Sequence, residues 1–542
     1  MVWLFFLLFG TGLWPGTGAM AQESSAEVDS RDRIGYIGTS PAFSPEALGG
    51  ATYFGEDAEP VPPGWTVVPE LSVKEVFTDN LFLTASDEEQ DFVTELTPRI
   101  NIYGNAKRAS VRVNYAPQGL LYANNGDENT LFHQLFSAGV GELVRQLVFI
   151  DGSATITQQN RTNTGTGVFT NFGPATFLGG VGDNINVTGE RTTVTTYHLS
   201  PYLVHRLGDW ADVELRFRYD DVSDSGGDDE ANVSASSTDS TSQKYYANIE
   251  SGSRFNELPW KATFQREDID YENANSTTFQ DLLGTVWYVY SPELSLLGSL
   301  GYQDNSFQSA GDQGSGIIWD VGVRWTPSAR TTLEATYGQR FFGDRYFFNF
   351  SHESRRTKWH ITYDEVPYTP RQAQIAEAVA AGGGAIPIVD PVTGLPTVTG
   401  AGIPTLSAEV YVQRRLSGGV VLEAGRNDFD ILVFQEERDF QFSGAGEDFW
   451  GASILWTRNI SRLTYLDMSA GWTSVDTNAV NTNTDLTDER QDDLLSLYLG
   501  LRRELGRHLT STIEYRRVER SSTDPTADLV ENRISAGIRL AF

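Results

Sequence analysis

Apolar and polar residues alternate along most of the chain after residue 65. In residues 211–220 the odd positions are apolar or aromatic, while the even positions carry Asp, Glu or Arg. Residues 92–103, 317–325, 333–340 and 495–501 repeat this pattern. A period of two places alternate side chains on opposite faces of a strand, which helical spacing does not do. About 22 such segments, each of roughly 9 to 15 residues, match the length of a tilted strand that crosses a bilayer.

The connections between these segments alternate in length. Short turns at 104–107, 207–210, 291–293 and 425–428 are interleaved with longer polar stretches at 160–190, 223–240, 364–408 and 474–490. Only the turn at Gly343-Asp344 is tight where a long loop is expected. Outer-membrane barrels are connected in this way, with short turns in the periplasm and long loops outside.

The pattern therefore predicts an all-β fold for residues 65–542: one large antiparallel up-and-down transmembrane β-barrel of about 22 strands, within a range of about 18 to 24. A soluble β-propeller or a series of sandwiches is the alternative, since these also have alternating strands. We find no blade-length repeat in the sequence. Residues 534–542 also resemble the closing strand of bacterial outer-membrane proteins, in which Phe542 takes the place of the terminal aromatic read by the assembly machinery.

The N-terminal residues predict export from the cytoplasm. An apolar run at 2–13 is followed by Ala19-Met20-Ala21, which predicts a secretory signal peptide over residues 1–21. No Lys or Arg precedes the run, and a membrane anchor is the alternative, although a span needs roughly 20 apolar residues. Residues 22–64 are rich in Glu, Asp, Ser, Pro and Gly, which predicts a mostly disordered periplasmic leader. The expected location is the outer membrane of a Gram-negative bacterium.

Composition narrows the chemistry. The chain has 40 Lys plus Arg and 72 Asp plus Glu, a formal charge of −32, which excludes a nucleic-acid binder. It has no cysteine, and its six histidines lack metal-ligand spacing. No nucleophile elbow or phosphate loop occurs. We therefore expect no enzyme, no metal site and no cofactor; a Ser-His pair facing lipid stays open, because such partners come from separate strands.

In a barrel the apolar set faces lipid and the polar set faces the lumen. Aromatic residues near strand ends suit the interfacial girdles: Tyr115, Tyr219, Trp260, Trp287, Trp319, Trp325 and Trp472. We expect the charged inner residues to pair across neighbouring strands, and the inner tyrosines to offer weak contacts to sugars. The predicted lumen-facing residues are Arg99, Arg112, Glu214, Arg216, Arg218, Lys261, Asp320, Arg324, Glu334, Arg340, Arg533, Arg539, Tyr103, Tyr246 and Tyr288.

A barrel of about 22 strands is wide enough that its lumen must be a channel or be plugged. Residues 22–64 are too few for a folded plug of the siderophore-transporter type. The candidates for a gate are the loop 364–408 with a helix-like stretch at 371–381, the Gly-rich loop 160–190, and the leader itself. Acidic clusters expected in outer loops, at 220–221, 228–230, 488–489 and 492–493, either collect Ca²⁺ against lipopolysaccharide phosphates or are simply solvated.

Several segments resemble a family of outer-membrane β-barrels associated with the exosortase/PEP-CTERM exopolysaccharide systems of Gram-negative bacteria. The likeness spans most of residues 65–542 and is carried by residues 69–81, 91–98, 151–154 with 158–159, 337–343, 425–427 and 436–439. The resemblance implies a role in moving a secreted polysaccharide across the outer membrane. It transfers no catalytic or binding residue, and a fold alone does not fix function.

The resulting hypothesis is a channel that exports an exopolysaccharide through a polar lumen. An acidic vestibule disfavours polyanions, which favours a neutral or zwitterionic glycan. The expected partners are outer-membrane lipid and lipopolysaccharide, the barrel assembly machinery, the polysaccharide and, as a possibility, a periplasmic polysaccharide exporter. A diffusion porin, general or substrate-specific, and a structural surface barrel with a blocked lumen are the alternatives.

Overall fold

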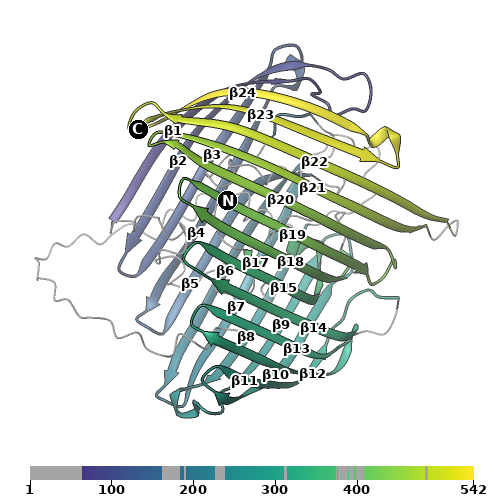
Figure 1. The fold of residues 1–542 in the computed structure, drawn as a ribbon. Coiled ribbons are helices and arrows are strands. Elements are labelled where there is room, and N and C mark those ends of the chain that lie inside the picture. The colour runs from purple at the N-terminus through teal and green to yellow at the C-terminus, as the bar shows by residue number, and fades with distance from the viewer. Residues whose placement is uncertain are drawn as a thin grey trace, which may run out of the picture.

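The computed structural model describes residues 64–160, 184–187, 191–225, 239–310, 314–373, 375, 388–389, 396–397, 408–481 and 486–542, and the predicted signal peptide and leader lie outside them, apart from Gly64. Twenty-two strands form one antiparallel sheet (Figure 1). The bounds of the first eleven are β1 Gly64–Thr78, β2 Asp91–Ala106, β3 Ala109–Tyr122, β4 Thr130–Val144, β5 Val148–Asn160, β6 Arg191–Leu207, β7 Ala211–Ser225, β8 Ser240–Ser251, β9 Trp260–Tyr271, β10 Thr277–Ser291 and β11 Leu294–Asp304.

The remaining strands of this sheet are β12 Ser315–Ser328, β13 Thr331–Arg340, β14 Gly343–Glu353, β15 Thr357–Tyr368, β18 Tyr411–Ala424, β19 Asn427–Phe440, β20 Gly446–Ser461, β21 Thr464–Asn481, β22 Leu486–Glu504, β23 Leu509–Ser522 and β24 Leu529–Ala541. Two short strands, β16 Ile388–Val389 and β17 Pro396–Thr397, pair only with each other. Helix in the described chain consists of three 3-10 turns, at 126–128, 253–255 and 525–527, and the turn at 370–373 with residue 375. No described helix is long and apolar enough to span a membrane.

The sheet closes on itself. β1 pairs with β2 on one side and with β24 on the other, so that Val76 lies opposite both Val93 and Ser535. In Figure 1 the yellow β24 accordingly lies beside the purple β1. Closure gives every strand two neighbours and removes the two edge strands that an open sheet would expose to hydrocarbon. The predicted all-β, up-and-down barrel of about 22 strands is confirmed.

Alternation separates an apolar outer face from a polar inner face. On β7, Leu215 is 50% exposed and Tyr219 is also exposed, whereas Asp220, which faces inward, is buried. On β12, Ile317 and Val321 are exposed while Asp320 is buried. The two sets follow the predicted period of two because the outer face contacts lipid and the inner face contacts water and other polar side chains.

Connection lengths differ at the two ends of the barrel as the sequence predicts. One end carries short turns, such as 107–108 between β2 and β3 and 425–426 between β18 and β19, where Gly425 has a positive φ of 72°. Both ends of the barrel sequence, Gly64 and Ala541, lie at this short-turn end. The other end carries most of the longer loops. The exceptions are the Phe341-Phe342 turn between β13 and β14 at that end and the longer connection 252–259 between β8 and β9 at the short-turn end.

Two sequence-based boundaries are corrected. Residues 474–490, predicted as a loop, belong mostly to β21 and β22, which continue to Asn481 and from Leu486. β15 likewise extends through Tyr368 into the loop predicted at 364–408. Beyond the bilayer both faces of a hairpin are wet, so these strand ends carry no apolar alternation. The acidic residues Asp220 and Asp492 are also not in outer loops, because both are buried on inner-wall strands.

The predicted faces of two neighbouring aromatics are reversed. Trp287, predicted for the interfacial girdle, lines a cavity inside the barrel, whereas Tyr288, predicted for the lumen, is 54% exposed on the outer face. β10 is apolar on both faces over residues 282–290, so its sequence does not specify which set points inward. A one-residue error then moves every side chain to the other face.

Three loops at the long-loop end fold onto or across the interior. Residues 184–187 of the β5–β6 connection place Ile185 in an apolar cluster on the inner side of β1, β2 and β3. In the β11–β12 connection, Ala310 donates to the carbonyl of Gln441 between β19 and β20. After β15, Arg371 reaches β7 and β8. The interior is therefore partly filled by the chain's own loops at this end.

Closure can be tested by cysteine cross-linking, because the chain contains no cysteine. Glu75 and Ala536 face each other across β1 and β24, so we expect the pair Glu75→Cys with Ala536→Cys to form a disulfide on mild oxidation. The measurement is a non-reducing gel of the folded protein. The shifted pair Glu75→Cys with Ile538→Cys is the matched control, and preferential cross-linking of that pair would contradict this register.

Candidate functional site: the inner wall of the barrel

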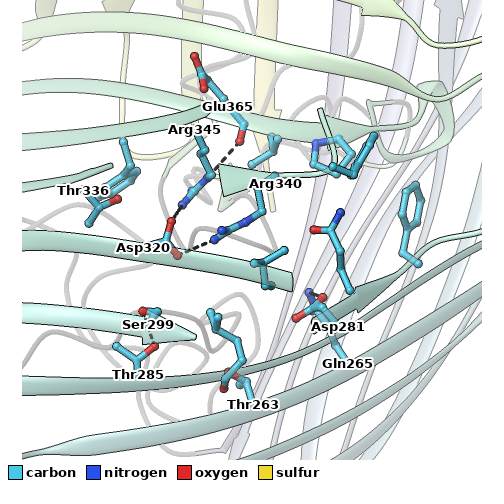
Figure 2. A pocket seen from close by; sticks show the side chains of 18 of the residues that line it. Thr263, Gln265, Asp281, Thr285, Ser299, Asp320, Thr336, Arg340, Arg345 and Glu365 are labelled. Carbon is cyan, nitrogen blue, oxygen red and sulfur yellow. Dashed lines mark hydrogen bonds and ion pairs between the residues drawn. The ribbon is translucent and has the colours of Figure 1, made fainter. Parts of the chain in front are cut away.

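The larger cavity lies along the inner faces of β8 to β15. Figure 2 shows its charged centre, where Arg340 donates to Asp320 at 2.7 Å and Arg345 lies 3.7 Å from the same carboxylate. Further along the wall Lys244 pairs with Glu267 at 3.5 Å. Gln265 donates to Asp281 at 2.5 Å. Cations and carboxylates thus neutralise one another locally.

Aromatic side chains share this cavity with the charged groups. Tyr246, Phe279, Trp287 and Phe347 all contribute to its lining. The indole N–H of Trp287 is buried and donates to no protein atom. A buried donor without a partner is unusual and leaves a hydrogen bond for a bound water or ligand. The cavity therefore combines flat apolar surfaces with hydrogen-bonding groups, a composition suited to sugars.

A second cavity lies at the barrel's closing strands. Its lining contains four cations, Lys74, Arg99, Arg502 and Arg539, and four carboxylates, Glu70, Glu95, Asp467 and Glu514. Lys74 lies 3.4 Å from Glu95 and 3.9 Å from Glu514, which ties β1 to β2 and to β23. The charges again alternate in sign along the wall.

A buried histidine joins three strands of the inner wall. His198 on β6 lies between Asp151 on β5, at 2.8 Å from Nε2, and Asp220 on β7, at 2.9 Å from Nδ1. Arg216 donates to Asp151 at 2.6 Å and Arg218 donates to Asp220 at 2.7 Å. Both ring nitrogens therefore face carboxylates, and this one side chain joins β5, β6 and β7.

A matching network occurs on β18, β19 and β20. Glu436 is fully buried and accepts from Arg415 at 2.5 Å and from Arg438 at 2.6 Å. Arg438 also donates to Glu447 at 3.1 Å and stacks over the ring of Phe449 at 4.2 Å. Each charge is held by neighbours on the adjacent strands, which is the arrangement expected for a rigid, hydrated wall.

The structure distributes the predicted lumen-facing residues over these groups. Lys261, Asp320, Glu334, Arg340 and Tyr246 line the larger cavity; Arg99 and Arg539 line the second; Glu214, Arg216 and Arg218 belong to the β7 network. Arg324 pairs with Glu334 at 2.7 Å, Arg533 pairs with Glu531 at 2.9 Å, and Arg112 lies 5.9 Å from the ring of Tyr103. Tyr288 is the exception, on the outer face. Phe542 donates its backbone N–H to the carbonyl of Pro69 and keeps an exposed side chain.

Sequence reasoning missed the residues that hold the networks together. Asp151, His198 and Asp220 are separated by 47 and 22 residues, so no local motif connects them. Glu436 and Arg438 lie in the sequence within a run of four charged residues, 436–439. Their burial follows from the strand register, which sets Arg415 opposite Glu436 and Gln413 opposite Arg438. In the described chain, no group of three or more His, Asp or Glu has the geometry of a metal site.

The loop residues that enter the barrel are held by specific contacts. Arg371 is 1% exposed; its Nε donates to Ser240 Oγ at 2.9 Å and its Nη2 donates to the Asp220 carbonyl at 3.2 Å. Ala373 packs on the cluster of Tyr368, Tyr411 and Phe440. The segment 369–373 therefore connects the wall at β15, β18 and β19 with the wall at β7 and β8.

A second loop segment is anchored near the closing strands. Asn186 donates to Glu531 at 2.8 Å and accepts a hydrogen bond from Arg533. Arg191 donates to the carbonyl oxygens of Asn184 and Asn186. These contacts place residues 184–187, from one of the loops predicted as a gate, against the inner wall. The rest of that loop, and residues 376–387 of the other, lie outside the described chain.

An apolar outer face, a charged inner wall and a closed ladder define a transmembrane β-barrel. No known family model matches the chain, and no curated protein matches it. Among solved structures, the siderophore receptor PirA from Acinetobacter baumannii is 9% identical, with 90% of this chain and 81% of that chain covered and a TM-score of 0.48. The FrpB iron transporter from Neisseria meningitidis (F3-3 variant) is 11% identical, with 89% and 82% covered and a TM-score of 0.49.

The Vibrio cholerae outer-membrane protein OmpT, as a loop-deletion mutant, is 10% identical over 88% of this chain and 100% of that chain, with a TM-score of 0.28. All three TM-scores are below 0.5, and these likenesses say nothing of what this chain binds or transports. The barrel's own inner wall carries the functional evidence.

The buried charge network makes a testable contribution to stability. Replacing one member leaves its partner charged and buried, so we expect Glu436→Gln to lower the free energy of unfolding by about 3 kcal/mol. The measurement is urea unfolding of the lipid-embedded barrel. Arg206→Met is the control, because its pair with Asp212 is largely exposed and contributes less than about 1 kcal/mol. Equal losses in both variants would contradict the assigned role of the network.

Proposed function

We propose that this protein is an outer-membrane channel of a Gram-negative bacterium that exports an exopolysaccharide and has no catalytic role. The observation that carries the proposal is the inner wall, where paired charges and aromatic rings line a barrel of 22 strands. Transmembrane barrels have polar interiors, and this wall adds aromatic rings to its paired charges, a combination that suits contact with water and polar solutes.

The balance of charge on the inner wall supports a neutral or zwitterionic glycan. Ion pairs such as Arg340–Asp320 and Arg324–Glu334 cancel the local field, although the whole chain carries −32. A polymer that meets neither a strong positive nor a strong negative wall is not held at one position. Conduction requires contacts strong enough to guide and weak enough to release, and the aromatic rings of Tyr246 and Trp287 supply contacts of that kind.

The inward segments support a closed resting state. Residues 184–187 and 369–373 narrow a lumen that would otherwise be open at this strand number. A periplasmic exporter that delivers the polymer would then be needed for opening. The resemblance of residues 69–81 and 436–439 to barrels of exosortase/PEP-CTERM systems favours a polysaccharide as the cargo.

Electrical recording distinguishes export from simple diffusion. We expect the purified barrel to show small or no steady conductance in planar bilayers, and Arg371→Ala to raise it at least twofold, because this change releases segment 369–373 from β7 and β8. Arg206→Met, at the exposed end of β6, is the control. Large, steady openings of the unmodified barrel would favour the diffusion porin.

Deletion of the gene tests the cargo. We expect loss of cell-surface and secreted polysaccharide, measured as hexose in the culture supernatant, with restoration by the intact gene. Unchanged secretion, with the barrel still present in the outer membrane of the parent strain, would favour a structural surface barrel.

A further inference from the structure

The barrel wall is incomplete between β14 and β15. These strands pair from Phe348 opposite Tyr363 to Glu353 opposite Lys358, and there the ladder ends. Residues 343–347 and 364–368 continue as strands and are all described, yet no pair joins them. Each stretch keeps its other neighbour, 343–347 on β13 and 364–368 on β18. We call this interruption the β14–β15 slit.

A proline explains why the ladder stops. The carbonyl of Glu365 accepts from Arg345 Nε at 3.2 Å, so the backbone of Glu365 faces β14. Residues two apart in a strand present their backbone groups to the same neighbour. Pro367 therefore also faces β14, and it has no N–H to donate to a ladder.

Side chains satisfy three of the backbone groups that face the slit, the carbonyl of Glu365 being the first. The N–H of Glu365 donates to Asp364 Oδ1 at 2.9 Å, and the N–H of Tyr346 donates to Glu365 Oε2 at 3.0 Å. Arg345 Nη2 also donates to Asp364 Oδ1 at 2.8 Å. An unsatisfied edge does not persist beside hydrocarbon, and at Tyr346 and Glu365 side-chain hydrogen bonds, some of which cross the slit, replace the backbone ladder. Separating them breaks no backbone ladder.

The larger cavity reaches the slit. Its lining includes Arg345 and Phe347 from β14 together with Glu365, Val366 and Pro367 from β15. By alternation Glu365 belongs to the outer face, with Ile361 and Tyr363, and yet it contributes to an interior cavity. Figure 2 shows Glu365 beside Arg345 at the margin of that cavity. The cavity thus extends into the wall where β14 and β15 separate.

The surroundings of the slit suit a lipid. Outside it, the rings of Trp319, Tyr337 and Tyr346 form a cluster with centroid separations of 5.7 and 5.3 Å, and Tyr346 is 50% exposed. Such aromatic clusters mark the level of the lipid head groups. Inside it, Phe341, Phe342 and Phe347 lie beside charged residues. A molecule with an acyl chain and a polar head fits the aromatic surface outside the slit and the mixed apolar and charged surface inside it.

We propose that the β14–β15 slit is a lateral portal, through which an acyl-chain lipid of the outer leaflet enters the larger cavity. The polar head then lies beside Arg340 and Asp320, while the chain passes between the two strand edges. This site goes beyond conduction along the barrel axis and does not depend on a polysaccharide as cargo.

Contact quenching tests the entry of lipid. The chain contains no cysteine, so Thr336→Cys provides a single site for a bimane label. This site lies on the inner wall at β13, opposite Phe347. The matched control is Ser72→Cys, on an inner wall paired on both sides with β2 and β24. In bilayers with phospholipid brominated near the head-group end of its chains, we expect quenching at Thr336→Cys to be at least twice that at Ser72→Cys. Equal quenching would overturn the portal.

Two further variants change the slit in opposite directions. Added to the Thr336→Cys background, Arg345→Met removes the bridges to Asp364 and Glu365 and is expected to increase quenching. Pro367→Thr restores a backbone donor and is expected to reduce it to the Ser72→Cys level. Arg324→Met, whose Glu334 partner lies in the paired part of β12 and β13, is the control for lost charge. An increase of the same size in Arg324→Met, or no decrease in Pro367→Thr, would contradict the proposal.

Discussion

Hydrocarbon offers no hydrogen bonds, and this single constraint organises the whole molecule. Each backbone N–H and C=O in the membrane must find a partner within the chain, and strands achieve this only by closing into a ring. The pairing of β1 with β24 completes that ring. Once the ring is closed, alternation alone decides which side chains face lipid and which face the interior.

The interior must then accommodate the polar half of every strand. The structure does so by placing opposite charges on adjacent strands, as in Arg415 and Glu436, and two residues apart on one strand, as in Glu436 and Arg438. Burying such a pair costs desolvation free energy, so the pair alone is weak evidence for stability. Removing one partner, however, strongly destabilises the fold because it leaves a buried charge without its counter-charge. The wall is therefore rigid and nearly neutral while remaining hydrated. That combination gives the described strands of a wide barrel a defined inner surface.

Much of this fold is predictable from the sequence because a period of two persists wherever one face is apolar and the other is not. Strands such as β7 and β12 meet that condition, and their faces are as predicted. β10 does not, since residues 282–290 are apolar on both faces, and Trp287 and Tyr288 were consequently assigned to the wrong sides. The sequence also mispredicts the ends of β21 and β22 as a loop, for the opposite reason: both faces of these strand ends are polar.

The individual contacts of the inner wall are harder to predict from the sequence. His198 meets Asp151 and Asp220 only through the register of three strands. Alternation places a residue on a face, but it does not give its height along the barrel, and height decides which charges meet. Arg371 shows a further limit, because nothing in a loop sequence indicates which distant strand it will contact.

The β14–β15 slit is consistent with the same constraint that closes the rest of the barrel. A ladder can end within the wall only if other groups take over its hydrogen bonds, and the side chains of Asp364 and Glu365 do so. Elsewhere in the sheet prolines interrupt pairing only locally: Pro98 lies opposite Pro117 in a short gap, and pairing resumes on either side. Between β14 and β15 it does not resume, because the Phe341-Phe342 turn ends β13 and β14 directly above. A gap with pairing on both sides is a fixed defect, whereas at the β14–β15 slit only side-chain hydrogen bonds join the two strand edges, so the slit can widen without breaking a backbone ladder.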